Sequence, residues 1–297
     1  MSERTAKVAY GLAAFGFLLL LVGSWWGLFM APPEQYMGQV ERILYVHVPT
    51  AWVAMLAFTS TFVCAVAFLV RNRWRWDWWL EASVEVAVVL GLMLCLQGSI
   101  WAKPTWGVWW DWDPRLTSTA ILVFAFVGVL ALRRFVDDPG RRAVWSSVAT
   151  IIAAVDVPIV YFSVKWWNSL HQLQSNPATV SPAFYAPLRI NAFGVLFLAA
   201  GMIALRSRIA KLRLERELAP PPQATAPEVV LAALAGTVGA AAGFTGKIHG
   251  GWTFVWLAYT ATALAFAAYM VSLHYRYRAE LRRAARAPGA AAGGISE

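Results

Sequence analysis

The segment WAKPTWGVWWDWDPRLTS, residues 101–118, holds five of the chain's seventeen tryptophans and is unlike an ordinary core or lipid-facing helix. We call it the tryptophan segment. If Pro104 opens a short helix, the spacing i, i+3, i+4 and i+7 predicts that four residues share one face. These residues are Trp106, Trp109, Trp110 and Asp113. The pattern would place three indoles beside one carboxylate.

The end of the tryptophan segment predicts the start of another helix. Asp113 followed by Pro114 is a favourable N-cap and first helical residue for the apolar run that begins at Leu116. Arg115 then lies in the first turn, where a cation opposes the helix dipole. A nearby anion would offset this unfavourable interaction between the arginine and the helix dipole. It could be Asp111, or an acidic ligand held by the guanidinium and the helix N-terminus together.

Two interpretations of the tryptophans are open. Trp is enriched at membrane interfaces because its apolar ring carries a single N–H donor, so an aromatic belt is the simpler interpretation. A belt does not explain indoles that share a face with fixed carboxylates and an arginine. We therefore favour a platform for a large, flat, apolar ligand with acidic substituents, such as haem. Its indoles would be Trp101, Trp106, Trp109, Trp110 and Trp112.

Composition predicts a polytopic membrane protein of the all-α class. Of 297 residues, 59% are hydrophobic and 14% are charged, and the mean hydropathy is +0.55. The net charge of +9 does not indicate nucleic-acid binding, because the basic residues form short clusters between apolar runs. Cys64 and Cys95 form neither C-x-x-C nor C-x-x-C-H, which excludes these thiol-redox and haem-attachment motifs.

Six apolar runs of membrane-spanning length predict a six-helix bundle over residues 1–218. They are residues 8–30, 50–70, 81–100, 116–132, 143–163 and 188–205. The first run is too long for a signal peptide, so we expect a retained anchor. Lys and Arg concentrate at 1–7, 71–75, 133–142 and 206–216. The positive-inside rule therefore predicts cytoplasmic termini and an outer tryptophan segment.

Two histidines fall on the same predicted side as the tryptophan segment. His47 lies in YVHVPTAW, and His171 lies in WWNSLHQ. A lone interfacial histidine is more often solvated or hydrogen-bonded than a metal ligand. Two imidazoles beside a tryptophan platform instead favour axial ligation of haem iron. Arg42 and Arg115 could then pair with the propionates. Their alternative partners are Glu41 and Asp111.

Three carboxylates lie within the predicted spans. Asp156 precedes Pro158 in the fifth run, and a carboxylate in a membrane is a candidate functional group. We favour the alternative that it pairs with backbone groups or hydroxyls freed by a kink at Pro158. Glu81 and Glu85 begin the third run, and we expect them to face the bundle or the inner interface.

The C-terminal part is predicted to be a separate unit. Residues 219–227 contain four prolines and are predicted to be a linker. The unit after it, residues 228–286, includes the uncharged run 248–273, followed directly by arginines. We expect His249 to be incidental, and residues 287–297 to be disordered.

The positions of the basic stretches predict one more membrane crossing in this unit. Both basic stretches, 206–216 and 276–286, should be cytoplasmic, so an even number of crossings must separate them. The weakly hydrophobic residues 229–245 are the candidate for the extra crossing. The complete prediction is therefore eight transmembrane helices with both termini in the cytoplasm.

WGVWWDWDPRLTS resembles the tryptophan-rich WWD motif of membrane proteins that handle haem in c-type cytochrome maturation. Together, YVHVPTAW, KPTWGVWWDWDPRLTS and VPIVYFSVKWWNSLHQ resemble the CcmC family over residues 40–206. The resemblance implies that His47 and His171 are axial ligands of a transiently bound haem b, cradled by the tryptophans. It also implies propionate contacts for Arg42 and Arg115. Asp111 and Asp156 depart from the family pattern and inherit no role.

The resemblance also implies a location and partners. Proteins of this family lie in the bacterial inner membrane and present haem from the periplasmic face to the chaperone CcmE, together with the ABC-type subunits CcmA and CcmB. The run HGGWTFVWLAY and the basic tail after it are similar to CcmD, a single-span companion of CcmC. A fusion of the two, with residues 229–245 as a connector, would explain the linker.

Three functions compete. We prefer haem binding and transfer, and we therefore do not expect an enzyme. Related WWD proteins are cytochrome c synthases, but by resemblance they carry further histidines inside their helices and larger periplasmic domains. A haem permease would need ligands along its route, and the predicted spans offer only Asp156 and Gln97 as notable polar groups.

Overall fold

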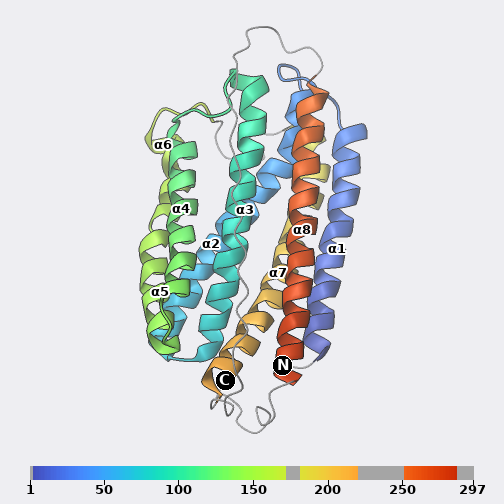
Figure 1. Cartoon of the computed structure of the whole chain (residues 1–297). Coiled ribbons are helices and arrows are strands. Elements are labelled where there is room, and N and C mark those ends of the chain that lie inside the picture. Colours follow the sequence, from blue (N-terminus) through green and yellow to red (C-terminus); the bar gives the residue numbers. More distant parts are fainter. Residues whose placement is uncertain (1–2, 172–180, 220–250, 286–297) are drawn as a thin grey trace, which may run out of the picture.

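The computed structural model describes residues 3–171, 181–219 and 251–285, which form a helical bundle (Figure 1). The long helices are α1 Glu3–Phe29, α2 Leu44–Arg71, α3 Trp74–Trp106, α4 Pro114–Phe135, α5 Pro139–Ala154, α6 Asp156–Trp166, α7 Tyr185–Leu218 and α8 Trp252–Ala285. Short 3-10 helices, η1 Gln39–Ile43 and η2 Pro182–Phe184, precede α2 and α7. The predicted all-α class is confirmed, since the described ranges contain no strand.

Seven helical stretches in the described ranges are long and apolar enough to cross a membrane. Six of them correspond to the six predicted runs, and α8 corresponds to the run 248–273. The protein is therefore a multi-pass membrane protein. About 20 helical residues cross the hydrocarbon core. Since α3 has 33 residues and α7 has 34, both extend beyond that thickness.

The fifth predicted run is one span made of two helices, α5 and α6. The break falls at Val155, whose N–H reaches the carbonyl of Ile152 at 3.2 Å. Pro158 explains this position, because a proline ring clashes with the carbonyl four residues before it, here that of Ala154. Asp156 lies beside the break, and its buried Oδ2 has no hydrogen-bond partner among the described residues. The expected pairing with freed backbone groups is therefore not formed by this oxygen.

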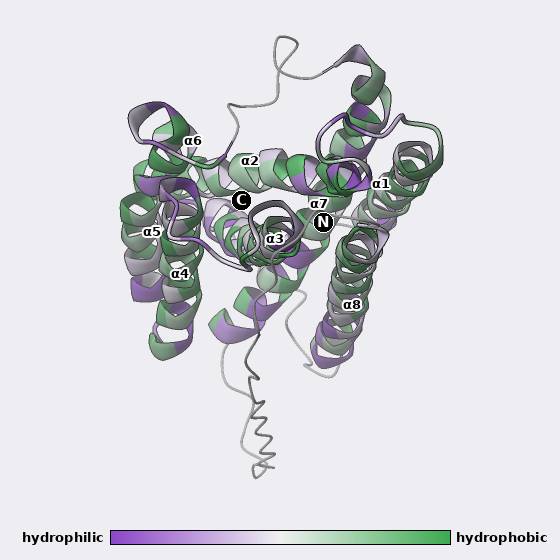
Figure 2. Ribbon diagram, turned by 90° about the horizontal axis from the view of Figure 1, so that it is seen from above, coloured by the Kyte–Doolittle hydropathy of each residue, from purple (hydrophilic) through white to green (hydrophobic). Residues whose placement is uncertain are grey.

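The helices form two groups around a central pair. In Figures 1 and 2, α4, α5 and α6 lie on one side of α2 and α3, and α1 and α8 lie on the other. We call the end where α3 finishes and α4 begins the tryptophan end. The opposite end is the basic end, because the arginine-rich stretches 71–75, 133–142 and 206–216 lie there.

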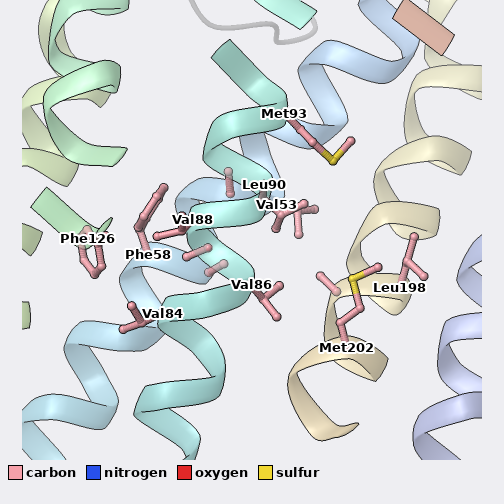
Figure 3. Close-up of a cluster of buried hydrophobic side chains, with 14 of the residues drawn as sticks. Val53, Phe58, Val84, Val86, Val88, Leu90, Met93, Phe126, Leu198 and Met202 are labelled. Carbon is pink, nitrogen blue, oxygen red and sulfur yellow. The ribbon is translucent and has the colours of Figure 1, made fainter. Parts of the chain in front are cut away.

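Helix α3 is the centre of the apolar core (Figure 3). Its buried residues point in all directions and include Val84, Val86, Val88, Leu90 and Met93. A helix that is apolar on every side is expected to be surrounded by other helices. Phe58 of α2 and Phe126 of α4 meet beside it, with ring centroids 4.7 Å apart. On the other side, Met202 of α7 is fully buried.

Helices α1 and α7 pack closely together, and glycines permit the close approach. A Cβ atom on Gly16 would lie 2.4 Å from the backbone nitrogen of Leu198, and one on Gly201 would lie 2.6 Å from the carbonyl of Ala9. Membrane helices pack closely through such small residues, because no hydrophobic effect drives their association within lipid.

Gly16→Ala is therefore expected to destabilise the protein, although alanine is the better helix former. Overpacking a tight contact costs roughly 1–3 kcal/mol. Gly11→Ala on the same helix is the matched control, because a Cβ atom at Gly11 meets nothing within 4 Å. Denaturant unfolding in detergent should show a lower midpoint for Gly16→Ala only. Equal midpoints for the two variants would contradict the packing argument.

An ion-pair network at the basic end joins α3 to three other helices. Arg133 of α4 donates to Asp77 at 2.8 Å and to Glu81 at 2.9 Å. Arg206 and Arg213 of α7 also bind Glu81, and Arg206 reaches Glu85 at 2.7 Å. These contacts confirm that Glu81 and Glu85 face the bundle. Arg276 of α8 also pairs with Glu85.

Helices α7 and α8 run in the same direction. Arg216 near the end of α7 pairs with Glu280 near the end of α8, while Trp252 at the start of α8 packs at the tryptophan end. The predicted crossing 229–245, residues 220–227 of the linker, His249 and the tail 287–297 all lie outside the described residues. They stay predictions, as do the cytoplasmic termini.

Candidate functional site

A cavity of about 650 Å³ opens at the tryptophan end, between α2, α3, α4 and α6. This volume is within the range of roughly 300–1,000 Å³ that is usual for ligand sites. Its lining is mostly apolar and includes Met55, Leu94, Cys95, Leu116 and Val160. The polar lining residues His47, Arg115, Lys165 and His171 lie at or just beyond the helix ends of the tryptophan end, and we call this part of the lining the rim. The cavity is therefore mainly apolar, with its cations at the tryptophan end.

His47 lines this cavity from the first turn of α2. Its ring stands edge-on to the indole of Trp101, with centroids 5.4 Å apart and planes at 78°. Its Nδ1 is buried and has no hydrogen-bond partner in the described structure. Gly98 lies directly below, since a Cβ atom there would come within 3.3 Å of His47 Cε1. Only Nε2 is therefore left to meet a ligand.

A proline two residues later helps to place His47. Pro49 is inside α2 and has no N–H to donate to the carbonyl of Tyr45. Asn191 of α7 satisfies that carbonyl instead, with a hydrogen bond of 2.7 Å. This side chain ties the first turns of α2 to α7. No sequence pattern indicates this role of Asn191, because it depends on a contact between helices that are distant in sequence.

His171 reaches the cavity from the segment that follows α6. Its Nδ1 lies 3.2 Å from Asp113 Oδ1, and its ring stands edge-on to the indole of Trp106, with centroids 5.2 Å apart. Asp113 also accepts a hydrogen bond of 2.7 Å from the N–H of Leu170. The predicted N-cap is confirmed, because Asp113 accepts from the N–H of Arg115 at 2.8 Å. One carboxylate thus caps α4 and holds His171.

Burial keeps the imidazole of His171 neutral. Burial lowers the pKa of His171, and this effect outweighs the attraction of the Asp113 carboxylate. Burial by itself would raise the pKa of Asp113, but hydrogen bonds from Ser169, Leu170 and Arg115 hold it below its ordinary value. The carboxylate is therefore ionised at neutral pH, and His171 is a neutral imidazole whose one unprotonated nitrogen can bind a metal.

The tryptophan segment does not form the predicted short helix. Helix α3 instead continues through Pro104 to Trp106 and ends at Gly107, which has a φ of 81°. Glycine adopts this left-handed conformation without strain and is a common helix terminator. The residues from 107 to 113 are not helical. The predicted shared face, with three indoles beside one carboxylate, is therefore wrong.

The five tryptophans of the segment divide into two sets. Those that line the cavity are Trp101, Trp106 and Trp110. Trp109 turns toward α8 and contacts Phe254, with ring centroids 6.2 Å apart. Trp112 is 79% exposed and touches the edge of Trp110. Neither Trp109 nor Trp112 lines the cavity.

Arg42 and Arg115, the two predicted propionate partners, differ in their position relative to the cavity. Arg115 lines the cavity, and its Nε is buried without a hydrogen-bond partner among the described residues. Arg42 does not line the cavity. Its guanidinium contacts Gln39, the carbonyl of Gly27 and the ring of Trp252. The structure brings Lys165 to the rim in its place, a residue that sequence reasoning did not select.

The fold and the cavity define a class: a polytopic helical membrane protein with two histidines facing one basic-edged, apolar cavity. The family follows from comparison with known proteins. The family model described as Heme exporter protein C, CcmC, matches residues 1–219. The chain belongs to the CcmC family.

Curated relatives agree with this assignment. Heme exporter protein C of Escherichia coli is 36% identical over 206 residues, which are 69% of this chain and 84% of that protein. The same-named protein of Bradyrhizobium diazoefficiens is 34% identical over 215 residues, 70% of this chain and 81% of that protein. A putative cytochrome c biosynthesis ccmC-like mitochondrial protein of Marchantia polymorpha is 33% identical over 174 residues, covering 59% and 72%. Helix α8 lies beyond the matched residues 1–219, so its similarity to CcmD stays a prediction.

Proposed function

We propose that this protein binds haem b transiently at the tryptophan end and delivers it to a CcmE-like chaperone in c-type cytochrome maturation. The observation that carries the proposal is that His47 and His171, from distant parts of the chain, line the same cavity. The names of the relatives, which refer to heme export and to cytochrome c biosynthesis, support it. Haem is the cargo in this proposal, and the protein carries out no reaction on it.

The donor set fits an iron porphyrin. The Nε2 atoms of His47 and His171 would bind the iron, since Nδ1 of His47 is buried and Nδ1 of His171 contacts Asp113. The indoles of Trp101, Trp106 and Trp110 would contact the apolar ring. The cations at the cavity edge would meet the propionates, and they are Arg115 and Lys165. Arg42 would act indirectly, by fixing η1 before α2.

We further propose an orientation and a set of partners. The tryptophan end would face the periplasm, because the arginine-rich stretches of the described helices collect at the other end. The site would then be open to a periplasmic chaperone. CcmA and CcmB would be the ABC-type partners, and α8 would be a CcmD-like helix supplied in cis.

The test is spectroscopic and uses the purified full chain. The haem-loaded protein should show a low-spin, bis-histidine spectrum, and the haem should move to an added apo CcmE-like chaperone in membrane vesicles. A high-spin spectrum, or haem that stays on the protein, would refute the proposal. Formation of a thioether on an added C-x-x-C-H peptide, without the chaperone, would instead identify a cytochrome c synthase.

A further inference from the structure

We propose that the two axial histidines are unequal: Asp113 anchors His171 to the iron, and His47 is the ligand that leaves when haem is passed on. The inference rests on the proposed function and adds the order in which the protein releases its cargo. It comes from a difference in what the second nitrogen of each ring contacts.

His171 is held in place through its Nδ1. The Asp113 carboxylate lies 3.2 Å from that nitrogen, and its side chain is only 1% exposed. The same carboxylate binds the N–H of Leu170 at 2.7 Å and that of Arg115 at 2.8 Å. The segment after α6 is thus tied to the N-terminus of α4. A carboxylate that accepts the Nδ1 proton orients an imidazole and makes its Nε2 a stronger donor to a metal.

His47 has no such hydrogen-bond support from the part of the chain that the structure describes. Its Nδ1 is buried and has no partner among the described residues, so this atom can neither reach a ligand nor give its proton to an acceptor. Nε2 must therefore bind the iron, while Nδ1 carries an unsatisfied proton. The ring is oriented only by packing, against the edge of Trp101 and above Gly98. An unsatisfied buried donor is unfavourable, so this proton weakens the hold of His47 on the iron.

The order of release follows from this difference. The weaker of two opposed iron–nitrogen bonds breaks first, so an acceptor's ligand would replace His47 while His171 still holds the haem. One neutral nitrogen leaves the iron and one ligand takes its place, so the protein neither gains nor loses a proton. Asp113 is then a positioning residue that keeps the cargo from escaping before the acceptor has bound it.

The experiment compares haem release from His47→Gly and His171→Gly in the full haem-loaded chain, with apomyoglobin as the haem acceptor. We expect His171→Gly to release haem at least about 10-fold faster than His47→Gly, in line with the usual value of second-shell support. We also expect added imidazole to restore a low-spin spectrum in His47→Gly, because His171 keeps the haem in the site. Equal release rates, or faster release from His47→Gly, would overturn the inference.

The variant Asp113→Asn tests directly whether the Asp113 carboxylate supports His171 as a ligand. Asparagine caps a helix as well as aspartate, so α4 should still begin correctly. The variant should release haem about 10- to 100-fold faster and should have a higher haem reduction potential, because the donor opposite His47 loses its anionic partner. Asp111→Asn, at an exposed position in the same segment, is the control and should change neither value. An unchanged potential in Asp113→Asn would overturn the inference.

A wild-type protein without a bis-histidine spectrum would overturn the proposed function itself.

Discussion

Replacing His47 and His171 together by alanine is expected to abolish stable haem binding and the low-spin spectrum of the purified protein. Both rings line the cavity, and each can offer only Nε2 to a ligand. With both removed, the indoles and the two cations of the cavity could still attract a porphyrin, but no histidine of the described cavity lining would hold the iron. Each single variant should keep one ligand and show a weakened spectrum. Absorption spectra after affinity purification measure the effect.

The matched control for this prediction is His274→Ala. His274 lies near the basic end, where its Nδ1 is 3.0 Å from the hydroxyl of Tyr10, far from the cavity. Its replacement should leave the spectrum unchanged. A double variant of His47 and His171 that retained the full wild-type spectrum would show that the iron is bound elsewhere, and the axial assignment would be wrong.

Glu81→Gln is expected to lower the free energy of unfolding by about 3–5 kcal/mol, the usual cost of removing one partner from a buried ion pair. The Glu81 side chain is only 6% exposed and is bound by guanidiniums from α4 and α7. Glutamine has nearly the same shape but no charge. It would leave Arg133 and Arg206, both buried, with less compensation in a region of low dielectric. Unfolding by denaturant in detergent gives the measurement.

Glu215→Gln is the control for Glu81→Gln. Glu215 is on α7 near the same end, with 36% of its side chain exposed and Lys211 at 3.7 Å. Because the Glu215 carboxylate is partly exposed and the Lys211–Glu215 distance is long, we expect this pair to contribute about 0–1 kcal/mol, as surface pairs do. A loss for Glu81→Gln no larger than that for Glu215→Gln would show that the network contributes little to stability. The haem spectrum of Glu81→Gln should be unchanged, because the cavity lies at the opposite end of α3.

The membrane spans were predictable because the requirement for crossing a bilayer, a long enough run of apolar residues, is met within each segment of the chain. A run of about 20 apolar residues suffices to cross a bilayer, so each helix is recognisable from its own residues. The same holds for the cap at Asp113, which depends only on the residue types that follow it. The tryptophan segment shows where local reasoning fails. A helical spacing beyond Trp106 has no effect once Gly107 ends the helix.

The site depended on contacts that no local pattern specifies. The sequence pointed to Arg42 and Arg115 as an equivalent pair of cations. The structure separates them, because Trp252 of α8 and the carbonyl of Gly27 hold the Arg42 side chain away from the cavity. Lys165 lies at the rim of the cavity because α6 packs beside α4 (Figure 1).

The sequence alone determined that this chain is an all-helical membrane protein. It also determined that His47, His171 and the tryptophan segment lie near helix ends. Both follow from hydropathy and motif spacing, which are properties of short stretches. Tertiary structure alone decided that both histidines face one cavity, that Asp113 supports His171 and not His47, and that three of the five tryptophans line the space. The physical reason is that a hydrogen bond or a cavity wall requires groups from distant helices to meet. Only the packing of the whole bundle brings them together.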